Sequence, residues 1–209
     1  MKVLYSDNHI VVCVKPIGVL SQADSGGGES MVSLLSDMFS CEIYPLHRLD
    51  KGVSGVMIYA KTKLAASELS RDIAEHRLKK EYLAVVGGIP DESGELVDLL
   101  FKDSKKNKSF VVNRPRKGVK QAKLSYWRVK TDNEKSLVRV LLHTGRTHQI
   151  RVQFSSRKMP LLGDKKYGGD SRFENIALLS YRITFNHPKT KQEMVFTTDD
   201  NEFINEFFG

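Results

Sequence analysis

Short apolar segments separated by polar turns make up most of the chain. Residues 3–5 and 10–14 are the first two, and Asp7-Asn8 between them is typical of a turn. The continuous apolar segment at residues 56–60 predicts a buried strand. Further strands are expected at residues 80–86, 119–131, 137–144, 178–185 and 193–197.

Apolar residues at helical spacing predict helices between some of these strands. Residues 29–39 and 63–77 each repeat apolar residues every three or four positions, which is typical of amphipathic helices. Thr147 is a favoured cap for a third helix that runs to about Ser156, and residues 201–208 favour a short helix. The inner faces of the first two helices are expected to be Met31, Leu34, Leu35 and Met38, and Leu64, Ala65, Leu69 and Ile73.

The order of these elements indicates the fold class. Strands outnumber helices and are mostly joined by short turns, which favours an α+β fold with a largely antiparallel central sheet flanked by helices and loops. Residues 21–30, with three consecutive glycines, favour a flexible loop, and residues 89–109 favour a short hairpin and an exposed basic loop. Since no internal repeat or linker is visible, a single domain is expected over residues 1–209.

Composition places the chain among globular proteins. Of 209 residues, 40% are hydrophobic and 28% are charged. No apolar segment reaches the ~18 residues of a membrane span, and the N-terminus lacks a signal-peptide core, so we expect a cytoplasmic protein without membrane contact. Cys13 and Cys41 lack metal-binding spacing and are expected to be buried thiols in a reducing compartment.

Positive charge is concentrated in one region. Residues 102–130 contain eleven Lys or Arg and one acid, so this region alone carries a charge of +10 while the whole chain carries +8. Such a region indicates a polyanionic partner, most simply nucleic acid, although a solvated charged face is the alternative. Phe110, Tyr126 and Trp127 suit base stacking or, equally, a strand that faces the core. The candidate phosphate contacts are Lys105, Lys106, Arg114, Arg116 and Lys117.

The nine residues His47 to Gly55 combine an imidazole, a guanidinium, a carboxylate and two glycines. They come directly before the apolar segment at 56–60, so we expect a loop at the end of a buried strand, where reactive groups can be exposed and still held rigidly. Gly55 and Gly52 permit backbone angles or close approaches that other residues resist. An ordinary surface turn is the alternative interpretation.

Two further stretches are candidates for chemistry. In Gly145 to Arg151, a helix would place His148 and Arg151 on one face, and Arg151 could otherwise be an exposed ion pair. Tyr82 lies in the strand at 80–86 and could equally be a core tyrosine.

Together these motifs resemble the pseudouridine synthases of the RluA type. The resemblance covers almost the whole chain, from about Val3 to Phe196, and its motifs occur in the family's order. Val53 and Gln153 depart from the family's usual threonine and histidine, which bears on loop details and substrate. The matching motifs are His47-Arg48-Leu49-Asp50-x-x-x-Ser54-Gly55, Lys80-x-Tyr82-x-Ala84, Gly145-Arg146-Thr147-His148-Gln149-Ile150-Arg151 and Gly163-Asp164-x-x-Tyr167-Gly168.

The resemblance implies isomerisation of uridine within rRNA or tRNA, with no cofactor and no metal. Asp50 would be the essential carboxylate, either as nucleophile at the ribose or as base on its 2′ proton. Arg151 would keep this carboxylate ionised, and Tyr82 would stack on the target uracil. The enzyme would act as a monomer.

The same resemblance implies RNA contacts around the reacting uridine, which must leave its stack. Arg48 would fill the gap left by the flipped base, and His47 would shape the loop by hydrogen bonding. Arg146 and His148 are further candidate RNA contacts. The small N-terminal RNA-binding domain of many relatives is expected to be absent. The catalytic domain itself would then bind the RNA, which is expected to be compact.

Two other functions compete with this interpretation. A metal-dependent nuclease would use His47, Asp50, His143 and His148, but these residues do not have ligand spacing and the nearby arginines would repel a cation. A non-catalytic RNA-binding protein on the same fold would keep the basic region but would have no use for Asp50, Tyr82 and Arg151 together.

Overall fold

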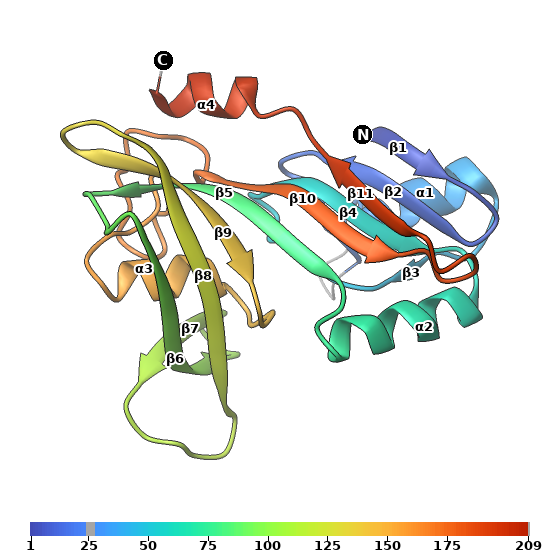
Figure 1. Cartoon of the computed structure of the whole chain (residues 1–209), viewed down its shortest axis with the longest axis horizontal. Coiled ribbons are helices and arrows are strands. Elements are labelled where there is room, and N and C mark those ends of the chain that lie inside the picture. The colour runs from blue at the N-terminus through green and yellow to red at the C-terminus, as the bar shows by residue number, and fades with distance from the viewer. Residues whose placement is uncertain (24–27, 209) are drawn as a thin grey trace. The chain divides into compact units, whose positions relative to one another are not determined.

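The computed structural model describes residues 1–23 and 28–208, so part of the predicted glycine-rich loop lies outside the described residues. The chain forms two compact units (Figure 1). Unit 1 consists of Met1–Lys80 and Leu179–Asn201, and unit 2 consists of Glu81–Leu178 and Glu202–Gly209.

Unit 1 is built on a mostly antiparallel sheet. Its strand order is β1-β2-β4-β10, with β11 on β10 and β3 on β4. The pairings are antiparallel except that β4 and β10 run parallel, where Leu179 lies opposite Ser54. The strands are β1 (Lys2–Ser6), β2 (Ile10–Lys15), β3 (Tyr44–Pro45), β4 (Ser54–Ala60), β10 (Leu178–Asn186) and β11 (Glu193–Thr197).

Two helices complete unit 1 at the predicted places, α1 (Met31–Phe39) and α2 (Lys63–Ala74). Ser30 and Thr62 are their N-caps, and each side chain accepts a backbone N–H of the first turn. The predicted inner faces are too wide, because Met38 is 55% and Leu64 is 71% exposed. In each helix the buried residues are four apart, Met31 and Leu35 in α1 and Ala65 and Leu69 in α2.

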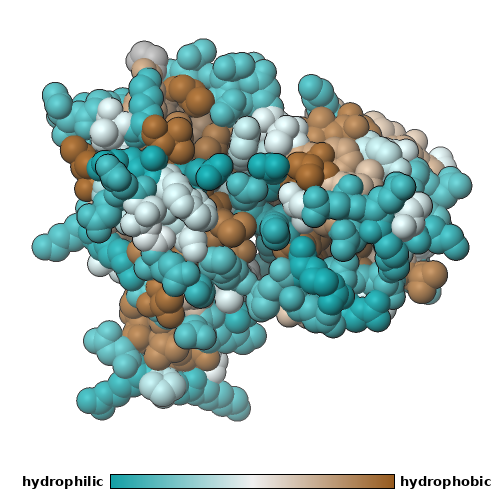
Figure 2. Space-filling model, in the orientation of Figure 1, coloured by the Kyte–Doolittle hydropathy of each residue, from teal (hydrophilic) through white to brown (hydrophobic). Residues whose placement is uncertain are grey.

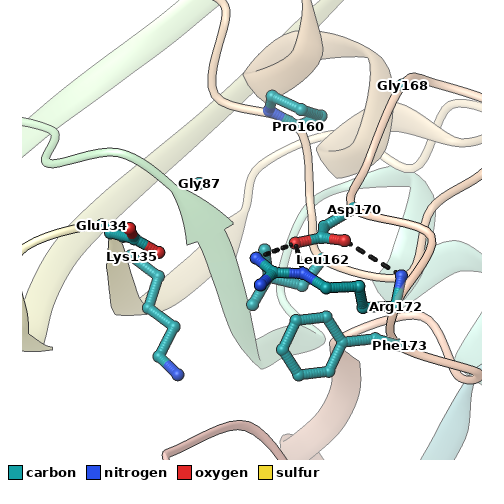
Figure 3. Close-up of a pocket in the computed structure, with 9 residues that line it drawn as sticks. All are labelled: Gly87, Glu134, Lys135, Pro160, Leu162, Gly168, Asp170, Arg172 and Phe173. Atoms are coloured by element: carbon teal, nitrogen blue, oxygen red, sulfur yellow. Dashed lines mark hydrogen bonds and ion pairs between the residues drawn. The ribbon is translucent and has the colours of Figure 1, made fainter.

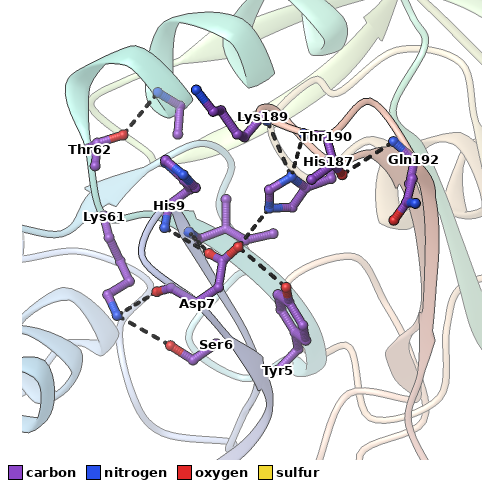
Figure 4. A network of polar contacts seen from close by, with 12 residues as sticks. Tyr5, Ser6, Asp7, His9, Lys61, Thr62, His187, Lys189, Thr190 and Gln192 are labelled. Carbon is purple, nitrogen blue, oxygen red and sulfur yellow. Dashed lines mark hydrogen bonds and ion pairs between the residues drawn. The ribbon is translucent and has the colours of Figure 1, made fainter.

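A polar network in unit 1 joins the β1–β2 turn to the β10–β11 turn (Figure 4). Asp7 Oδ1 accepts the backbone N–H groups of His9 and Ile10, at 2.7 and 2.8 Å. His187 is buried, and its Nε2 lies 2.8 Å from Asp7 Oδ2. Because His187 Nδ1 accepts the Thr190 N–H at 3.0 Å, the ring proton is on Nε2 and is donated to Asp7. The predicted turn at Asp7 is therefore confirmed and is anchored by a second turn.

Unit 2 is built on strands in the order β5-β9-β8-β6-β7. The β6–β7, β6–β8 and β8–β9 pairs are antiparallel. The helix α3 packs against β6 and β7 (Figure 1). The elements are β5 (Lys79–Gly87), β6 (Ser93–Asp103), β7 (Lys108–Val112), β8 (Val119–Thr131), β9 (Lys135–Leu142), α3 (Gln149–Ser155) and α4 (Asn201–Phe208).

The largest difference from the sequence prediction is β6. Residues 89–109 were expected to form a short hairpin and an exposed basic loop. The hairpin exists, because β6 and β7 pair antiparallel around an exposed turn with Lys105 and Lys106, but β6 is an eleven-residue strand that also pairs with β8. Its exposed face carries Glu95 and Val97, and its buried face carries Leu96 and Leu100. The apolar residues of β6 lie on both faces of the strand and are interrupted by Asp98, which hid the period of the strand.

The two cysteines differ in environment. Cys13 is buried in β2 as expected, whereas Cys41 is only half-buried, because it lies in the turn after α1 where its carbonyl accepts the Ser36 hydroxyl. Within the described part of the chain, no helix is both long enough and apolar enough to cross a membrane.

Candidate functional site

The loop that carries Asp50 lies in unit 1, between β3 and β4, and its backbone is fixed on both sides of this residue. Ser21 Oγ accepts the Leu49 N–H and donates to the Leu49 carbonyl, both at 2.9 Å. Lys51 O accepts the Gly18 N–H at 2.9 Å. Asp50 itself is half-buried. Its carboxylate is thus carried by a segment whose neighbours cannot easily shift.

Lys15 supports the same loop through hydrogen bonds to its backbone and to that of the neighbouring turn. Its side chain is fully buried at the end of β2, and its Nζ donates to the carbonyls of Pro16 at 2.9 Å, Val19 at 2.8 Å and Lys51 at 3.3 Å. Burial lowers the pKa of Lys15 to about 8, and the negative charge of Asp50 opposes this shift. Lys15 is therefore an electrostatic neighbour of Asp50. Nothing in the sequence indicates that Lys15 is buried, because a lysine after an apolar strand normally faces water.

Gly55 confirms the expectation of a close backbone approach. Its φ is +124°, and a Cβ at this position would lie 2.2 Å from the carbonyl oxygen of Ser180 on the neighbouring strand. Val53, one of the two departures from the family pattern, is buried, and its N–H donates to the Asp50 carbonyl at 3.0 Å. The end of the loop is thus held by packing and by a turn.

His47 and Arg48 begin this loop. His47 Nε2 accepts the Ile58 N–H at 3.3 Å, which holds the loop against β4. Burial, with a further contribution from the charge of Lys80, lowers the pKa of His47 to about 3, so its imidazole is neutral at physiological pH. Arg48 is exposed, as a residue that contacts RNA must be.

Arg151 lies in unit 2, on α3, and is buried. Its Nε and Nη2 donate to Asp164 Oδ2 and Oδ1, at 2.7 and 2.8 Å, and both side chains are almost completely shielded from water. Its guanidinium also lies 5.1 Å from the centre of the Tyr167 ring. The alternative of an exposed ion pair is therefore wrong. Asp164 belongs to the Gly163-Asp164 motif, to which sequence reasoning had assigned no role.

The turn before α3 is organised differently from the prediction. Thr147 does not cap the helix; the N-cap is His148, with a φ of +53° and no capping side chain. Instead, Gln149 Oε1 accepts from Thr144 Oγ1 at 2.8 Å and from the Arg146 N–H at 3.0 Å. His148 Nδ1 lies 3.0 Å from the Tyr167 hydroxyl. The Gln149 side chain thus fixes the turn that precedes the helix and does not cap the helix itself.

Gln153, the other departure from the family pattern, is buried on α3. Its Nε2 donates to Asp98 Oδ2 at 2.7 Å and to the Leu96 carbonyl at 3.1 Å. These bonds attach α3 to β6. Ile150 and Phe154 are buried on the same helix, as predicted for its core face.

Tyr82 lies on β5 and is 5% exposed, so in this structure it is a buried tyrosine. It belongs to unit 2 with Arg151, whereas Asp50 belongs to unit 1. That these three side chains form one site remains a prediction. The three aromatic residues of the basic region differ in exposure: Tyr126 is buried, whereas Phe110 and Trp127 are partly exposed.

The candidate phosphate contacts lie on exposed turns of unit 2. Lys105 and Lys106 occupy the β6–β7 turn, and the loop between β7 and β8 carries Arg114, Arg116 and Lys117. In Figure 2 hydrophilic residues project around a small apolar patch on the part of unit 2 that carries these turns in Figure 1.

Lys166 joins this surface through contacts with the β6–β7 turn that the sequence could not show. The Lys108 ammonium donates to the Lys166 carbonyl at 2.6 Å, and the Lys166 ammonium donates to the Asn107 carbonyl at 3.0 Å. Lys165 is also exposed beside them. Residues 165–166 thus extend the basic surface of the β6–β7 turn.

A pocket of about 500 Å³ opens elsewhere in unit 2 (Figure 3). Its lining includes Arg172, Asp170 and Phe173 but none of the residues predicted to act in catalysis. The Arg172 guanidinium is bound to the Asp170 carboxylate at 2.6 Å, so these two charges already compensate each other. Among the residues with described positions, no cluster of three or more His, Cys, Asp or Glu side chains could hold a metal ion.

Comparison with known proteins identifies the family. The profile of the RNA pseudouridylate synthase family matches residues 9–156. A ribosomal large subunit pseudouridine synthase C of Buchnera aphidicola is 30% identical over 90% of this chain and 63% of the relative. A tRNA pseudouridine synthase C of Pasteurella multocida is 28% identical over 93% of this chain and 89% of the relative.

A solved structure supports the same conclusion at the level of the fold. Human RNA pseudouridylate synthase domain containing 4 aligns with a TM-score of 0.79 and 21% identity, covering 98% of this chain and 91% of that one. The chain spans about two thirds of the length of the ribosomal relative. With the family profile matched over most of its length, the chain belongs to the RNA pseudouridylate synthase family of isomerases.

Proposed function

We propose that this chain isomerises uridine to pseudouridine within RNA, with Asp50 as the essential carboxylate. The observation that carries the proposal is the rigid loop around Asp50, whose flanking backbone is bound to Ser21 and Gly18 and supported by the buried Lys15. A reacting carboxylate must be held in place while a flexible substrate moves, and this loop provides such support.

The reaction balances without any added reagent. The bond between N1 of uracil and C1′ of ribose breaks, the base turns, and a bond forms between C5 and C1′. The C5 proton is lost and N1 gains one, so the product is an isomer of the substrate. Asp50 would act either as nucleophile at C1′ or as base on the 2′ proton, and either role needs an ionised carboxylate. No cofactor or metal is required.

Arg151 and Tyr82 would complete the catalytic set, in an α+β fold with a largely antiparallel sheet. Arg151 would keep Asp50 ionised, and Tyr82 would stack on the flipped uracil. The firm hold of Asp164 on Arg151 supports this assignment, because a guanidinium that is already oriented can face a second carboxylate without losing side-chain entropy.

RNA would be held mainly through its phosphates. The exposed Lys105, Lys106, Arg114, Arg116 and Lys117 suit phosphate contacts, which give affinity without sequence discrimination. Arg48 would fill the space of the flipped base, and His47 would shape the loop that carries it. Arg146 and His148, which contact the Gln121 carbonyl and the Tyr167 hydroxyl, are further candidate RNA contacts. The names of the relatives suggest rRNA or tRNA as substrate, and a cytoplasmic monomer fits both.

Mapping of pseudouridine tests the proposal directly. Purified protein would be incubated with tRNA and with rRNA fragments, and new pseudouridines located by chemical labelling and sequencing. We expect one or a few new sites, which should be missing from cells that lack the gene. RNA that is bound but never modified in either experiment would favour a binding protein on the same fold.

A further inference from the structure

Lys80 is a partly buried cation without a visible partner. It is the second residue of β5, and its side chain is half-buried. Within residues 1–23 and 28–208, it makes no hydrogen bond, ion pair or ring contact. Other shielded cations of unit 1 are compensated: Lys15 by three carbonyls, and Lys61 by the Asp7 carbonyl at 2.7 Å. An ammonium partly removed from water without compensation destabilises the free protein.

Lys80 lies beside the loop that carries Asp50. Leu78, two residues earlier, packs in the same apolar cluster as Leu46 and Ile58. His47 follows Leu46 and accepts the Ile58 N–H. The positive charge of Lys80 adds to burial in lowering the pKa of His47, and burial lowers the pKa of Lys80 itself. The packing of Leu78, together with the effect of the Lys80 charge on His47, places the ammonium next to the start of the loop, within unit 1.

The surroundings of Lys80 suit an anion that arrives from solution. Buried polar atoms without a partner include His47 Nδ1 but not Lys80 Nζ, so the ammonium keeps some contact with solvent. Arg48 and Lys51 on the neighbouring loop are exposed and also positive. In RNA the anions closest to a reacting ribose are the two phosphodiesters bonded to its own 3′ and 5′ oxygens.

We propose that Lys80 binds an RNA phosphate adjacent to the target uridine. This inference rests on the proposed function for its substrate, and it assigns to the Lys80-x-Tyr82 motif a residue that holds the nucleotide beside Asp50. The contact needs a positive charge and not a particular hydrogen-bond geometry, so arginine should replace lysine. Because the contact is made to phosphate, it contributes affinity and position rather than base recognition.

The adjacent Lys79 provides a matched control. It lies on the same strand with the same charge, but it is exposed. Lys80→Met, Lys80→Arg and Lys79→Met would be compared for RNA binding at several salt concentrations and for single-turnover rate at saturating RNA. We expect Lys80→Met to weaken binding about five- to tenfold near 0.1 M salt and to lower the salt slope by about one. Lys80→Arg and Lys79→Met should resemble the wild type, and the rate at saturation should change little.

Two results would overturn the inference. One is unchanged affinity and salt slope in Lys80→Met. The other is a large fall in rate at saturating RNA with unchanged affinity, which would place the cation in the chemical step. Lys80→Gln gives a second neutral variant if the methionine variant does not fold. RNA binding is measured independently of turnover. If the protein binds RNA but forms no pseudouridine, the proposed function is wrong, and the binding data still test the Lys80 contact.

Discussion

The Arg151 guanidinium holds the Asp164 carboxylate through two parallel hydrogen bonds of 2.7 and 2.8 Å, in an interior from which water is excluded. Such a pair adds little net stability over an apolar replacement, but removing one partner leaves a buried charge uncompensated. The pair therefore fixes the orientation of Arg151 more than it stabilises the fold.

Asp164→Ala is expected to lower the free energy of unfolding by about 3–5 kcal/mol, because the buried Arg151 guanidinium would lose two charge-assisted hydrogen bonds. Urea denaturation measures this loss. Asp170→Ala breaks an exposed ion pair with Arg172 and serves as the matched control, which should unfold at almost the wild-type midpoint. Equal midpoints for the two variants would show that Arg151 finds another way to be satisfied.

Asp50→Asn is expected to abolish turnover while leaving RNA affinity almost unchanged. The amide keeps the shape of the carboxylate and the loop that supports it, but it can act neither as nucleophile nor as base. Pseudouridine formation and RNA binding would be measured on the same preparation. Asp37→Asn on the exposed side of α1 is the control for the substitution itself. Substantial turnover by Asp50→Asn would remove this residue from its proposed role.

The sequence predicts the site better where motifs are contiguous than where the fold builds them from distant segments. The loop around Asp50 and the strand after it were placed correctly, because a polar cluster before an apolar segment has few other interpretations. Lys15 was missed because its burial depends on carbonyls of Val19 and Lys51, which only folding brings to its ammonium. Asp164 was visible as part of a motif, but its partner lies thirteen residues earlier on a helix.

The wrong predictions for β6 and for the inner faces of α1 and α2 have the same cause. The length of β6 depends on two neighbouring strands that pair with it, and apolar residues on both of its faces hide its alternation. Leu64 and Met38 have helical spacing, but a helix that meets the sheet along a narrow line leaves them exposed. In each case tertiary contacts decided between conformations that local pattern left open.

Gly55→Ala is expected to destabilise unit 1 by at least about 1–3 kcal/mol and to reduce activity, since φ is +124° and the new methyl group would overlap the Ser180 backbone. Chemical denaturation and turnover are the two measurements. Gly87→Ala is the control, because its φ is not in the positive region and a Cβ there would lie 3.7 Å from the nearest atom, the Pro160 carbonyl. A Gly55→Ala protein as stable as Gly87→Ala would mean that the β4–β10 contact can open without cost.

Lys165→Glu/Lys166→Glu should weaken RNA binding as Lys105→Glu/Lys106→Glu does, because contacts between Lys166 and Asn107 join both pairs into one surface. Each phosphate contact that is lost should lower the salt slope of binding by about one. Filter binding between low and moderate salt measures this, with Lys63→Glu/Lys189→Glu, two exposed lysines of unit 1, as the control. Unchanged affinity of the lysine 165–166 pair at low salt would show that those charges are only solvated.

Lys15 gives the protein a predictable response to alkaline pH. Burial lowers its pKa to about 8 from the usual 10.5, so between these values the unfolded chain keeps a proton that the folded protein has released. Stability rises with pH wherever the unfolded state binds more protons. The free energy of unfolding of the wild type, relative to Lys15→Met, should therefore rise between pH 8 and 10, by at most about 1.4 kcal/mol per pH unit.

Urea denaturation of both proteins at pH 7, 8, 9 and 10 measures this difference. Subtracting one protein from the other removes the titrations that they share, including those of Cys13 and Tyr59, whose pKa values burial raises. At pH 7 the variant should also turn over more slowly, because the carbonyl of Lys51, next to Asp50, loses a donor. A difference that stays flat with pH would mean that the folded protein retains the Lys15 proton through this range, and that its three carbonyl partners outweigh the burial.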